Sequence, residues 1–323
     1  MSAEPDSRPV VCVARVLLEA GREPLAAEAE LREGGLDATP ERIAELARGA
    51  DAIVADPTVR VDEALLEAAG PGLRVVANFA VGIDNIDLEA CRRRAIPVTN
   101  TPDVLTDATA ELALALTLAA ARGTTAAEGD LRAGRWSGWD PGAYLGLELT
   151  GAAFAVVGFG RIGVRYAQLV RPLAGELLYV ARSPKPDAER DLGAVRVELA
   201  EGLRRADVVS LHVPAGAETR HLIAASELRS MRSHAVLVNT ARGSIVDTGA
   251  LVRALEAGEI GAAGLDVYEA EPDVGEGLLA APRCTLLPHI GSATTRAREA
   301  MARIAALNVL TALRGSEPPN RVV

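Results

Sequence analysis

The stretch "VVGFGRIG" has the residue types and spacing of a phosphate-binding loop. It places Gly158, Gly160 and Gly163 directly after an apolar run and before a helical pattern. In such a loop the first glycine permits a tight turn, the second lets the backbone approach a pyrophosphate, and the third lets the helix pack close to the strand. The helix N-terminus then directs N–H groups at the phosphates. A tight turn without a ligand is the alternative, but the strand–loop–helix setting favours a dinucleotide.

The next strand ends in cations where an NAD site would place a carboxylate. About 20 residues after the loop, an acidic residue usually bonds the ribose 2′-hydroxyl. In "LLYVARSPK" that place is taken by Ala181 and Arg182, with Ser183 and Lys185 beside them. A carboxylate would repel a 2′-phosphate, whereas an arginine binds one through two hydrogen bonds. A solvated basic turn is the alternative. We predict that NADP(H) is the preferred cofactor and that NAD(H) is possible.

Strands that alternate with helices must position these groups. Four strand-like runs with helical patterns between them precede residue 101, and a second series of runs begins at 152–158. This alternation predicts an α/β fold with two doubly wound, Rossmann-like domains and parallel sheets. The second series is continuous, whereas the first could recruit the amphipathic helix expected at about 294–313.

Composition narrows the class of protein. The chain has 323 residues, which suits two domains, and its net charge of −10 argues against a nucleic-acid partner. The longest apolar run, residues 112–121, is too short to span a membrane. The polar N-terminus does not resemble a secretion signal. Cys12, Cys91 and Cys284 lack metal-ligand spacing and suit reduced thiols. We therefore expect a cytoplasmic protein without a metal site.

Several segments resemble one family, the D-isomer-specific 2-hydroxyacid dehydrogenases, and within it the glyoxylate/hydroxypyruvate reductase branch. Besides the glycine loop, the matching segments are "NFAVGIDNIDL" (78–88), "IPVTNTPDVLTDATAELALAL" (96–116), "LVNTARGSIVD" (237–247), "AAGLDVYEAEP" (262–272) and "LLPHIGSAT" (286–294). The resemblance implies a homodimer. It also implies a substrate domain made of residues 1–101 and 292–323, into which a dinucleotide-binding domain, residues 102–291, is inserted.

The resemblance implies a catalytic set of Arg242, Glu271 and His289 for reduction of a small 2-oxoacid. Such a reaction needs a hydride donor, a proton donor for the forming alkoxide and a cation for the substrate carboxylate. His289 follows a strand-like run, at the edge where ligands bind in open α/β sheets, and can donate a proton near neutral pH. Glu271 would raise the pKa of His289, and Arg242 would bind the substrate carboxylate and polarise its carbonyl. Taken singly, each residue could equally be a structural loop residue.

Further contacts are implied by the same resemblance. Asp266 would bond the nicotinamide carboxamide, and Thr106 would touch the cofactor. The backbone N–H groups of Val81 and Gly82 would bind the substrate carboxylate, although an ordinary turn is the alternative. The other residues expected near the cofactor are Arg161, Ile162, His212, Pro214 and Thr240.

Two features of the chain leave substrate choice open. Trp139, in "GRWSGWDP" with Trp136, resembles a tryptophan segment at the family's dimer contact. It would form a pocket wall across the interface, and a core or interface anchor is the equal alternative. Asp56 departs from the family's pattern. A carboxylate near the pocket would repel an anionic substrate, so this residue leaves the preference for glyoxylate or hydroxypyruvate open.

Two other functions fit the same motifs. One is a family member that oxidises another donor, such as phosphite or formate, although formate enzymes have no acid in the role of Glu271. The other is a dimeric NAD(P)-sensing binding protein of the corepressor type, and measured turnover separates it from an enzyme.

Overall fold

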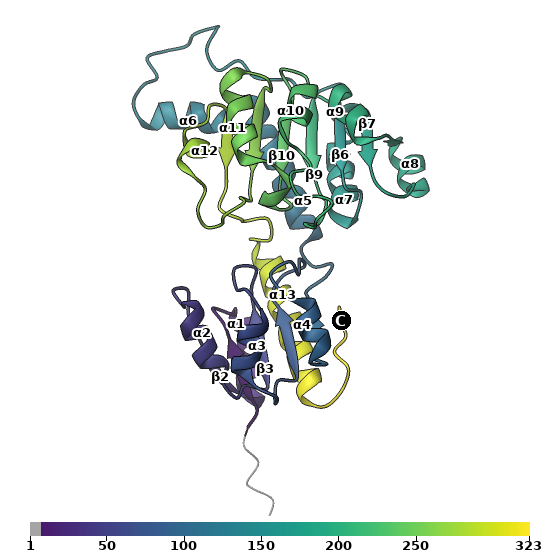
Figure 1. Cartoon of the computed structure of the whole chain (residues 1–323). Helices are drawn as coiled ribbons and strands as arrows, with labels where there is room; N and C mark the ends of the chain where they lie inside the picture. Colours follow the sequence, from purple (N-terminus) through teal and green to yellow (C-terminus); the bar gives the residue numbers. More distant parts are fainter. Residues whose placement is uncertain (1–7) are drawn as a thin grey trace, which may run out of the picture. The chain divides into compact units, whose positions relative to one another are not determined.

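The structure is a computed structural model that describes residues 8–323, and the chain folds as two units (Figure 1). Unit 1 combines the chain up to Leu105 with Ala293–Val323, and unit 2 is the continuous stretch Thr106–Ser292. Unit 2 is therefore inserted into the sequence of unit 1. The division of the structure falls after Leu105 and after Ser292, whereas the expected boundaries follow residues 101 and 291.

Unit 1 contains a parallel sheet with the strand order β2-β1-β3-β4-β5. The strands are β1 (Val10–Val13), β2 (Glu30–Glu33), β3 (Ala52–Ala55), β4 (Val75–Asn78) and β5 (Val98–Thr99). The central strands β3 and β4 are buried along their whole length, as is usual for a parallel sheet covered on both faces. The helices are α1 (Glu19–Glu28), α2 (Pro40–Ala47), α3 (Glu63–Ala69), α4 (Leu88–Arg93) and α13 (Thr295–Leu313).

The last helix of the chain, α13, completes unit 1 by packing against α1. The two helices approach closely at Gly21, where a Cβ atom would lie 2.4 Å from the carbonyl oxygen of Ala302. The residues after α13 reach β5, because the N–H of Val322 donates to the carbonyl oxygen of Val98 at 2.7 Å. Both ends of the chain therefore build one unit, as the sequence pattern of the terminal helix suggests.

Unit 2 contains a second parallel sheet, with the strand order β12-β11-β10-β9-β6-β7-β8. Its strands are β6 (Ala152–Val157), β7 (Ala174–Val180), β8 (Val195–Arg196), β9 (Val208–Leu211), β10 (Val236–Asn239), β11 (Ala262–Leu265) and β12 (Cys284–Leu286). The strand order reverses between β6 and β9. In doubly wound folds, ligands bind beyond the carboxyl ends of the strands at such a point.

Helices cover both faces of this second sheet. Alternate residues of β6 show it, because Phe154 and Val156 belong to one buried apolar cluster and Ala155 and Val157 to another. The predicted α/β fold with parallel, doubly wound sheets is thus confirmed. The helices are α5 (Thr106–Arg122), α6 (Thr124–Arg132), α7 (Arg161–Val170), α8 (Pro186–Leu192), α9 (Leu199–Arg205), α10 (Ala225–Ser230), the 3₁₀ turn η1 (Gly243–Ile245), α11 (Thr248–Ala257) and α12 (Glu276–Ala280).

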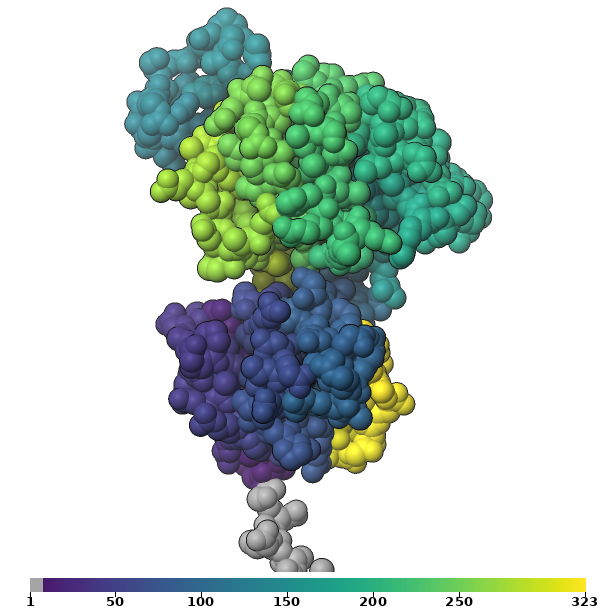
Figure 2. All heavy atoms as spheres, viewed as in Figure 1, coloured from purple at the N-terminus to yellow at the C-terminus, as the bar shows by residue number. Residues whose placement is uncertain are grey.

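A long exposed arm follows α6. Every residue from 131 to 146 is exposed, and Figure 2 shows this segment standing out from the rest of unit 2. No helix among residues 8–323 is both long and apolar enough to cross a membrane.

Candidate active site

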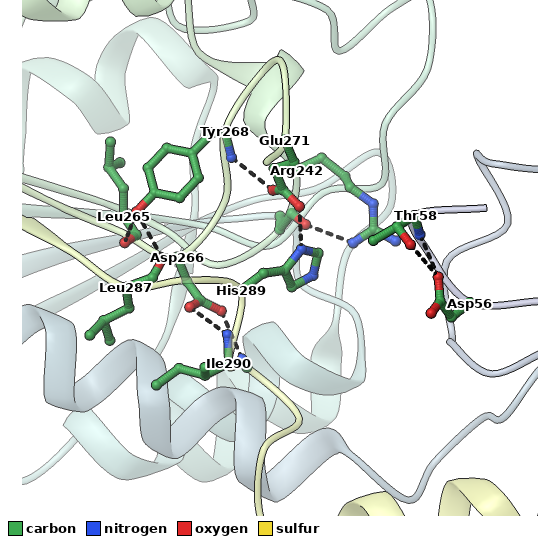
Figure 3. A network of polar contacts seen from close by, with 12 residues as sticks. Asp56, Thr58, Arg242, Leu265, Asp266, Tyr268, Glu271, Leu287, His289 and Ile290 are labelled. Carbon is green, nitrogen blue, oxygen red and sulfur yellow. Dashed lines mark hydrogen bonds and ion pairs between the residues drawn. The ribbon is translucent and has the colours of Figure 1, made fainter. Parts of the chain in front are cut away.

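Three neighbouring strands of unit 2 end at the residues expected to carry the chemistry. β10, β11 and β12 pair in parallel, so their carboxyl ends share one edge of the sheet. Arg242 follows β10, the segment from Asp266 to Glu271 follows β11, and His289 follows β12. Figure 3 shows these side chains close together at that edge. The structure therefore brings together the three residues of the expected catalytic set.

The imidazole of His289 is bonded to Glu271 (Figure 3). Its Nδ1 lies 2.6 Å from Oε2 of the carboxylate. The other carboxylate oxygen, Oε1, accepts the backbone N–H of Tyr268 at 2.9 Å. Because an ionised carboxylate only accepts hydrogen bonds, the proton of this bond belongs to Nδ1 of His289. The ring is thereby oriented with Nε2 directed away from Glu271.

The charge of Glu271 is maintained by its neighbours. Burial favours the neutral acid and raises the pKa of Glu271, but the hydrogen bond and the charge of His289, the N–H of Tyr268 and the charge of Arg242 outweigh it. The net effect is a lowered pKa. Glu271 is therefore ionised at neutral pH and available to stabilise an imidazolium.

Asp266 fixes the backbone that carries His289. Its side chain is fully buried, and its two carboxylate oxygens accept the N–H groups of Ile290 and Gly291, each at 2.7 Å. His289 itself has a backbone φ of 53°. This is the left-handed region, which residues other than glycine rarely adopt. Asp266 thus stabilises an unusual backbone at the candidate proton donor, a role that the sequence motif alone does not indicate.

A second histidine–carboxylate pair lies on the same segment as Glu271. Nε2 of His221 is 2.6 Å from Oε1 of Glu269, and the other carboxylate oxygen of Glu269 accepts the N–H of Thr248 at 3.0 Å. No motif in the sequence indicates this pair, because the two residues are 48 positions apart.

The glycine loop has the geometry that a pyrophosphate requires. A Cβ at Gly158 would lie 2.6 Å from the backbone of His212, and one at Gly163 would lie 2.1 Å from the carbonyl oxygen of Gly158. A Cβ at Gly160, by contrast, would meet no atom within 4 Å. Gly160 is also the N-cap of α7 and offers no side chain to its first N–H groups. The open space therefore lies where N–H groups could receive a phosphate.

The cationic turn after β7 is held by buried and charged neighbours. The hydroxyl of Tyr179 accepts the N–H of Lys185 at 2.8 Å and donates to Glu189. The guanidinium of Arg196 donates to the carbonyl oxygens of Ala181 and Arg182 at 3.0 and 3.1 Å. The side chains of Arg182 and Ser183 remain exposed. The backbone of this turn is thus ordered while its polar side chains face solvent.

The same tyrosine links this turn to the glycine loop. The rings of Phe159 and Tyr179 stack with a centroid separation of 4.3 Å. The stack packs the tip of β7 against the loop after β6, and one extended dinucleotide would contact both segments.

The remaining residues expected near the cofactor take different positions. Nε2 of His212 lies 2.8 Å from the hydroxyl of Ser210, and burial lowers the pKa of His212 to about 3. Its ring is therefore neutral and bonded internally. Thr240 is buried, and its hydroxyl has no partner within the described chain. The others are Thr106 and Arg161, which begin α5 and α7, Ile162, which packs on the apolar core, and Pro214, which is exposed.

Two residues that leave substrate choice open, Asp56 and Trp139, lie in unit 1 and on the arm. Asp56 turns its carboxylate to its own loop, where it accepts the N–H and the hydroxyl of Thr58 at 2.9 and 2.6 Å. Trp139 is 84% exposed on the arm.

Within residues 8–323, no group of three or more His, Cys, Asp or Glu side chains is arranged to hold a metal ion.

A family model and curated relatives match most of the chain. The family model "D-isomer specific 2-hydroxyacid dehydrogenase, NAD binding domain" matches residues 114–291. The glyoxylate reductase of Thermococcus litoralis is 47% identical over 282 residues, which is 86% of this chain and 85% of the relative.

Solved structures match almost the whole chain. The TT0316 protein of Thermus thermophilus is 42% identical with a TM-score of 0.90, and the match covers 97% of this chain and 100% of the other. An NADPH-dependent glyoxylate/hydroxypyruvate reductase of Sinorhizobium meliloti, solved with NADP and malonate, is 34% identical with a TM-score of 0.87 and coverages of 98% and 97%.

The glycine loop yields a prediction that separates binding from folding. We expect Gly160→Ala to weaken dinucleotide binding about tenfold or more without loss of thermal stability, because the added methyl group enters open space above the first N–H groups of α7. Gly163→Ala should lower the melting temperature, because its methyl group would meet the Gly158 carbonyl. Calorimetric titration and thermal melts measure the two effects. Unchanged dinucleotide affinity in Gly160→Ala would contradict the assignment of this loop.

Proposed function

Because the chain belongs to the D-isomer specific 2-hydroxyacid dehydrogenase family, we propose that it reduces a small 2-oxoacid to the D-2-hydroxyacid with a reduced nicotinamide cofactor. The proposed substrates are of the glyoxylate or hydroxypyruvate type, after the names of its relatives. The observation that carries the proposal is the 2.6 Å bond between His289 and Glu271, beside Arg242 at the carboxyl edge of the sheet.

His289 acts as the proton donor in this reaction. A reduced nicotinamide, when bound, would supply the hydride, and the carbonyl oxygen of the substrate would gain negative charge as the hydride is transferred. Since Nδ1 of His289 is engaged by Glu271, Nε2 is the atom that carries the transferable proton. The ionised Glu271 stabilises the imidazolium before transfer and keeps the ring in one orientation.

Arg242 balances the charge of the substrate. Its guanidinium binds the substrate carboxylate and polarises the carbonyl, which places positive charge where negative charge develops. The backbone N–H groups of Val81 and Gly82 are further ligands for this carboxylate. Asp266 would bond the nicotinamide carboxamide while it also fixes the backbone after His289.

NADP(H) is the proposed preferred cofactor. The open space at Gly160 suits the pyrophosphate, and the exposed Arg182 and Ser183 with the partly exposed Lys185 suit a 2′-phosphate. No carboxylate occupies the tip of β7, where one would select NAD(H). The NADP complex of the Sinorhizobium meliloti relative gives a precedent in the same fold.

A homodimer formed through the exposed arm is part of the proposal. Trp136, Trp139 and Leu145 are 58%, 84% and 80% exposed on this segment. Large apolar side chains that are largely solvated in a monomer are typical of protein interfaces. Trp139 is the candidate for a residue that one subunit contributes to the substrate pocket of the other.

Turnover tests the proposal as a whole. Glyoxylate and hydroxypyruvate should each oxidise NADPH, followed by the near-ultraviolet absorbance of the reduced nicotinamide, and the product should be the D-hydroxyacid. Tight NADPH binding without turnover of any 2-oxoacid would instead favour a nucleotide-sensing protein, and turnover only with phosphite would favour a different donor.

Removal of the imidazole separates chemistry from binding. We expect His289→Ala to lower kcat at least about a hundredfold, the usual contribution of a general acid, while the Kd of NADPH changes little. His234→Ala is the matched control, because His234 bonds Asp207, which precedes β9, far from the carboxyl ends of the strands. Equal loss of turnover and of NADPH binding would show that His289 is not the proton donor.

Removal of the Arg182 side chain in the turn after β7 tests the preference for NADP(H). Arg182→Ala should weaken NADPH about tenfold, because one charge-assisted interaction with the 2′-phosphate is lost, and leave NADH unchanged. Arg190→Ala serves as the control, since Arg190 is exposed on α8 and paired with Asp187 and Asp191. A ratio of NADPH to NADH affinity that stays the same in Arg182→Ala would contradict the preference.

Truncation of Trp139 tests whether one subunit contributes this residue to the substrate pocket of the other. We expect Trp139→Ala to remain dimeric and to change the ratio of kcat/KM for hydroxypyruvate and glyoxylate about fivefold or more, because a pocket wall is removed. Light scattering and steady-state kinetics measure the two properties. Loss of the dimer with an unchanged ratio at high protein concentration would assign Trp139 to the interface alone.

A further inference from the structure

The turn that follows β4 has three successive carbonyl groups that are all bonded on the same side. The donors come from the carboxyl ends of β4 and β5. Ala80 O accepts the N–H of Thr101 at 2.9 Å, Val81 O accepts Nδ2 of Asn100 at 2.9 Å, and Gly82 O accepts Nδ2 of Asn78 at 2.7 Å. Two of the three donors are thus side-chain amides.

The fixed carbonyl groups determine where the N–H groups point. In a trans peptide unit, the C=O of one residue and the N–H of the next point in opposite directions, and these peptide bonds are trans. The N–H groups of Val81, Gly82 and Ile83 are therefore directed away from Asn78, Asn100 and Thr101. In the described chain none of the three donates a hydrogen bond, and all three residues are partly exposed.

The amide side chain of Asn78 cannot rotate without loss of other bonds. Asn78 is 1% exposed, and its amide exchanges two hydrogen bonds with Asn85, at 3.0 and 3.2 Å. Asn85 in turn donates to the carbonyl oxygens of Asp56 and Val59. A rotated Asn78 amide would leave buried polar atoms without partners, which is costly.

Asn100 is held through its backbone. Its carbonyl oxygen accepts Nδ2 of the fully buried Asn308 at 3.2 Å, and its N–H donates to the carbonyl oxygen of Asn320 at 3.2 Å. The segment after β5 is therefore tied to α13 and to the chain end. The side chain of Asn100 is consequently presented to Val81 from a rigid base.

We infer that Asn78 and Asn100 are positioning residues for the carboxylate of the substrate. They hold the peptide groups of Val81 and Gly82 so that adjacent N–H groups face one small anion, and two oxygens of a carboxylate fit such a pair. The binding energy comes from the N–H groups, and the asparagines remove the cost of ordering them. This inference rests on the proposed reduction of a 2-oxoacid.

The experiment compares two variants of unit 1. Asn100→Ala removes the donor to Val81, whereas the control, Thr311→Ala, removes a hydroxyl of α13 that donates to the carbonyl oxygen of Leu307 in the same helix and does not touch the turn. We expect Asn100→Ala to raise the KM for glyoxylate and the Kd of oxamate, an unreactive 2-oxoacid analogue, about tenfold, because the carboxylate meets less ordered N–H groups. Its kcat should stay within about twofold, and Thr311→Ala should match the parent chain.

A structural defect alone would give a different pattern. If KM and oxamate affinity in Asn100→Ala equal those of the parent chain, or if KM, kcat and NADPH affinity all worsen together, the inference is overturned. Asn100→Leu, which keeps the volume of the side chain without its donor, repeats the test if the alanine variant does not fold.

NMR on the parent chain separates this inference from the proposed function. Addition of oxamate to the NADPH-bound protein should shift the amide resonances of Val81, Gly82 and Ile83, whether or not a 2-oxoacid is turned over. Turnover without any such shifts would overturn the inference and keep the proposed function. Shifts without turnover would keep the anion site and overturn the proposed function.

Discussion

The bond between His289 and Glu271 depends on the order of parallel strands in unit 2. Because β10, β11 and β12 are neighbours and run in the same direction, residues far apart in sequence reach one edge of the sheet. The loop after β11 must carry Glu271 to the side of His289, and the backbone after β12 must present the ring to it. A 2.6 Å contact between a charged acceptor and a ring N–H tolerates little displacement. The packing of both loops is therefore constrained by this one pair.

In each of three candidate subsites, which are the segment after His289, the turn after β4 and the turn after β7, a side chain fixes the backbone. Asp266 binds the two N–H groups after His289, Asn78 and Asn100 bind carbonyl groups of the turn after β4, and Tyr179 binds the N–H of Lys185. In each case a buried or tethered side chain holds the peptide groups next to the residue that would meet the ligand. Such preorganisation lowers the entropy lost on binding, since the ligand does not have to order the loop.

The sequence predicts the repeating units of this fold better than its edges. Buried strands such as β6 and β10 are continuous apolar runs and are recognised directly, and the glycine spacing identifies the loop before α7. The edge strand β2, with the sequence "ELRE", and the two-residue strand β8 have no apolar pattern, because an edge strand is only partly covered. Their existence follows from pairing with β1 and β7 rather than from local preference.

Some parts of the candidate site can likewise be predicted from the sequence, and others cannot. Motifs indicate Arg242, Glu271 and His289, because each follows a recognisable strand in a family-like segment. The backbone bonds of Asp266, the pairing of His221 with Glu269 and the support of the turn by Asn100 depend on contacts between distant segments. No spacing rule along the chain specifies such contacts, so they become visible only in three dimensions.

The most direct measurement is a two-bond proton–nitrogen NMR spectrum of the histidine rings, with His289 assigned by comparison with His289→Gln. The neutral ring of His289 should carry its proton on Nδ1, bonded to Glu271, so that Nε2 is the atom that exchanges a proton with the substrate. A neutral His289 protonated on Nε2 with a bare Nδ1 would contradict the account, because Glu271 would then neither orient the ring nor stabilise its charge.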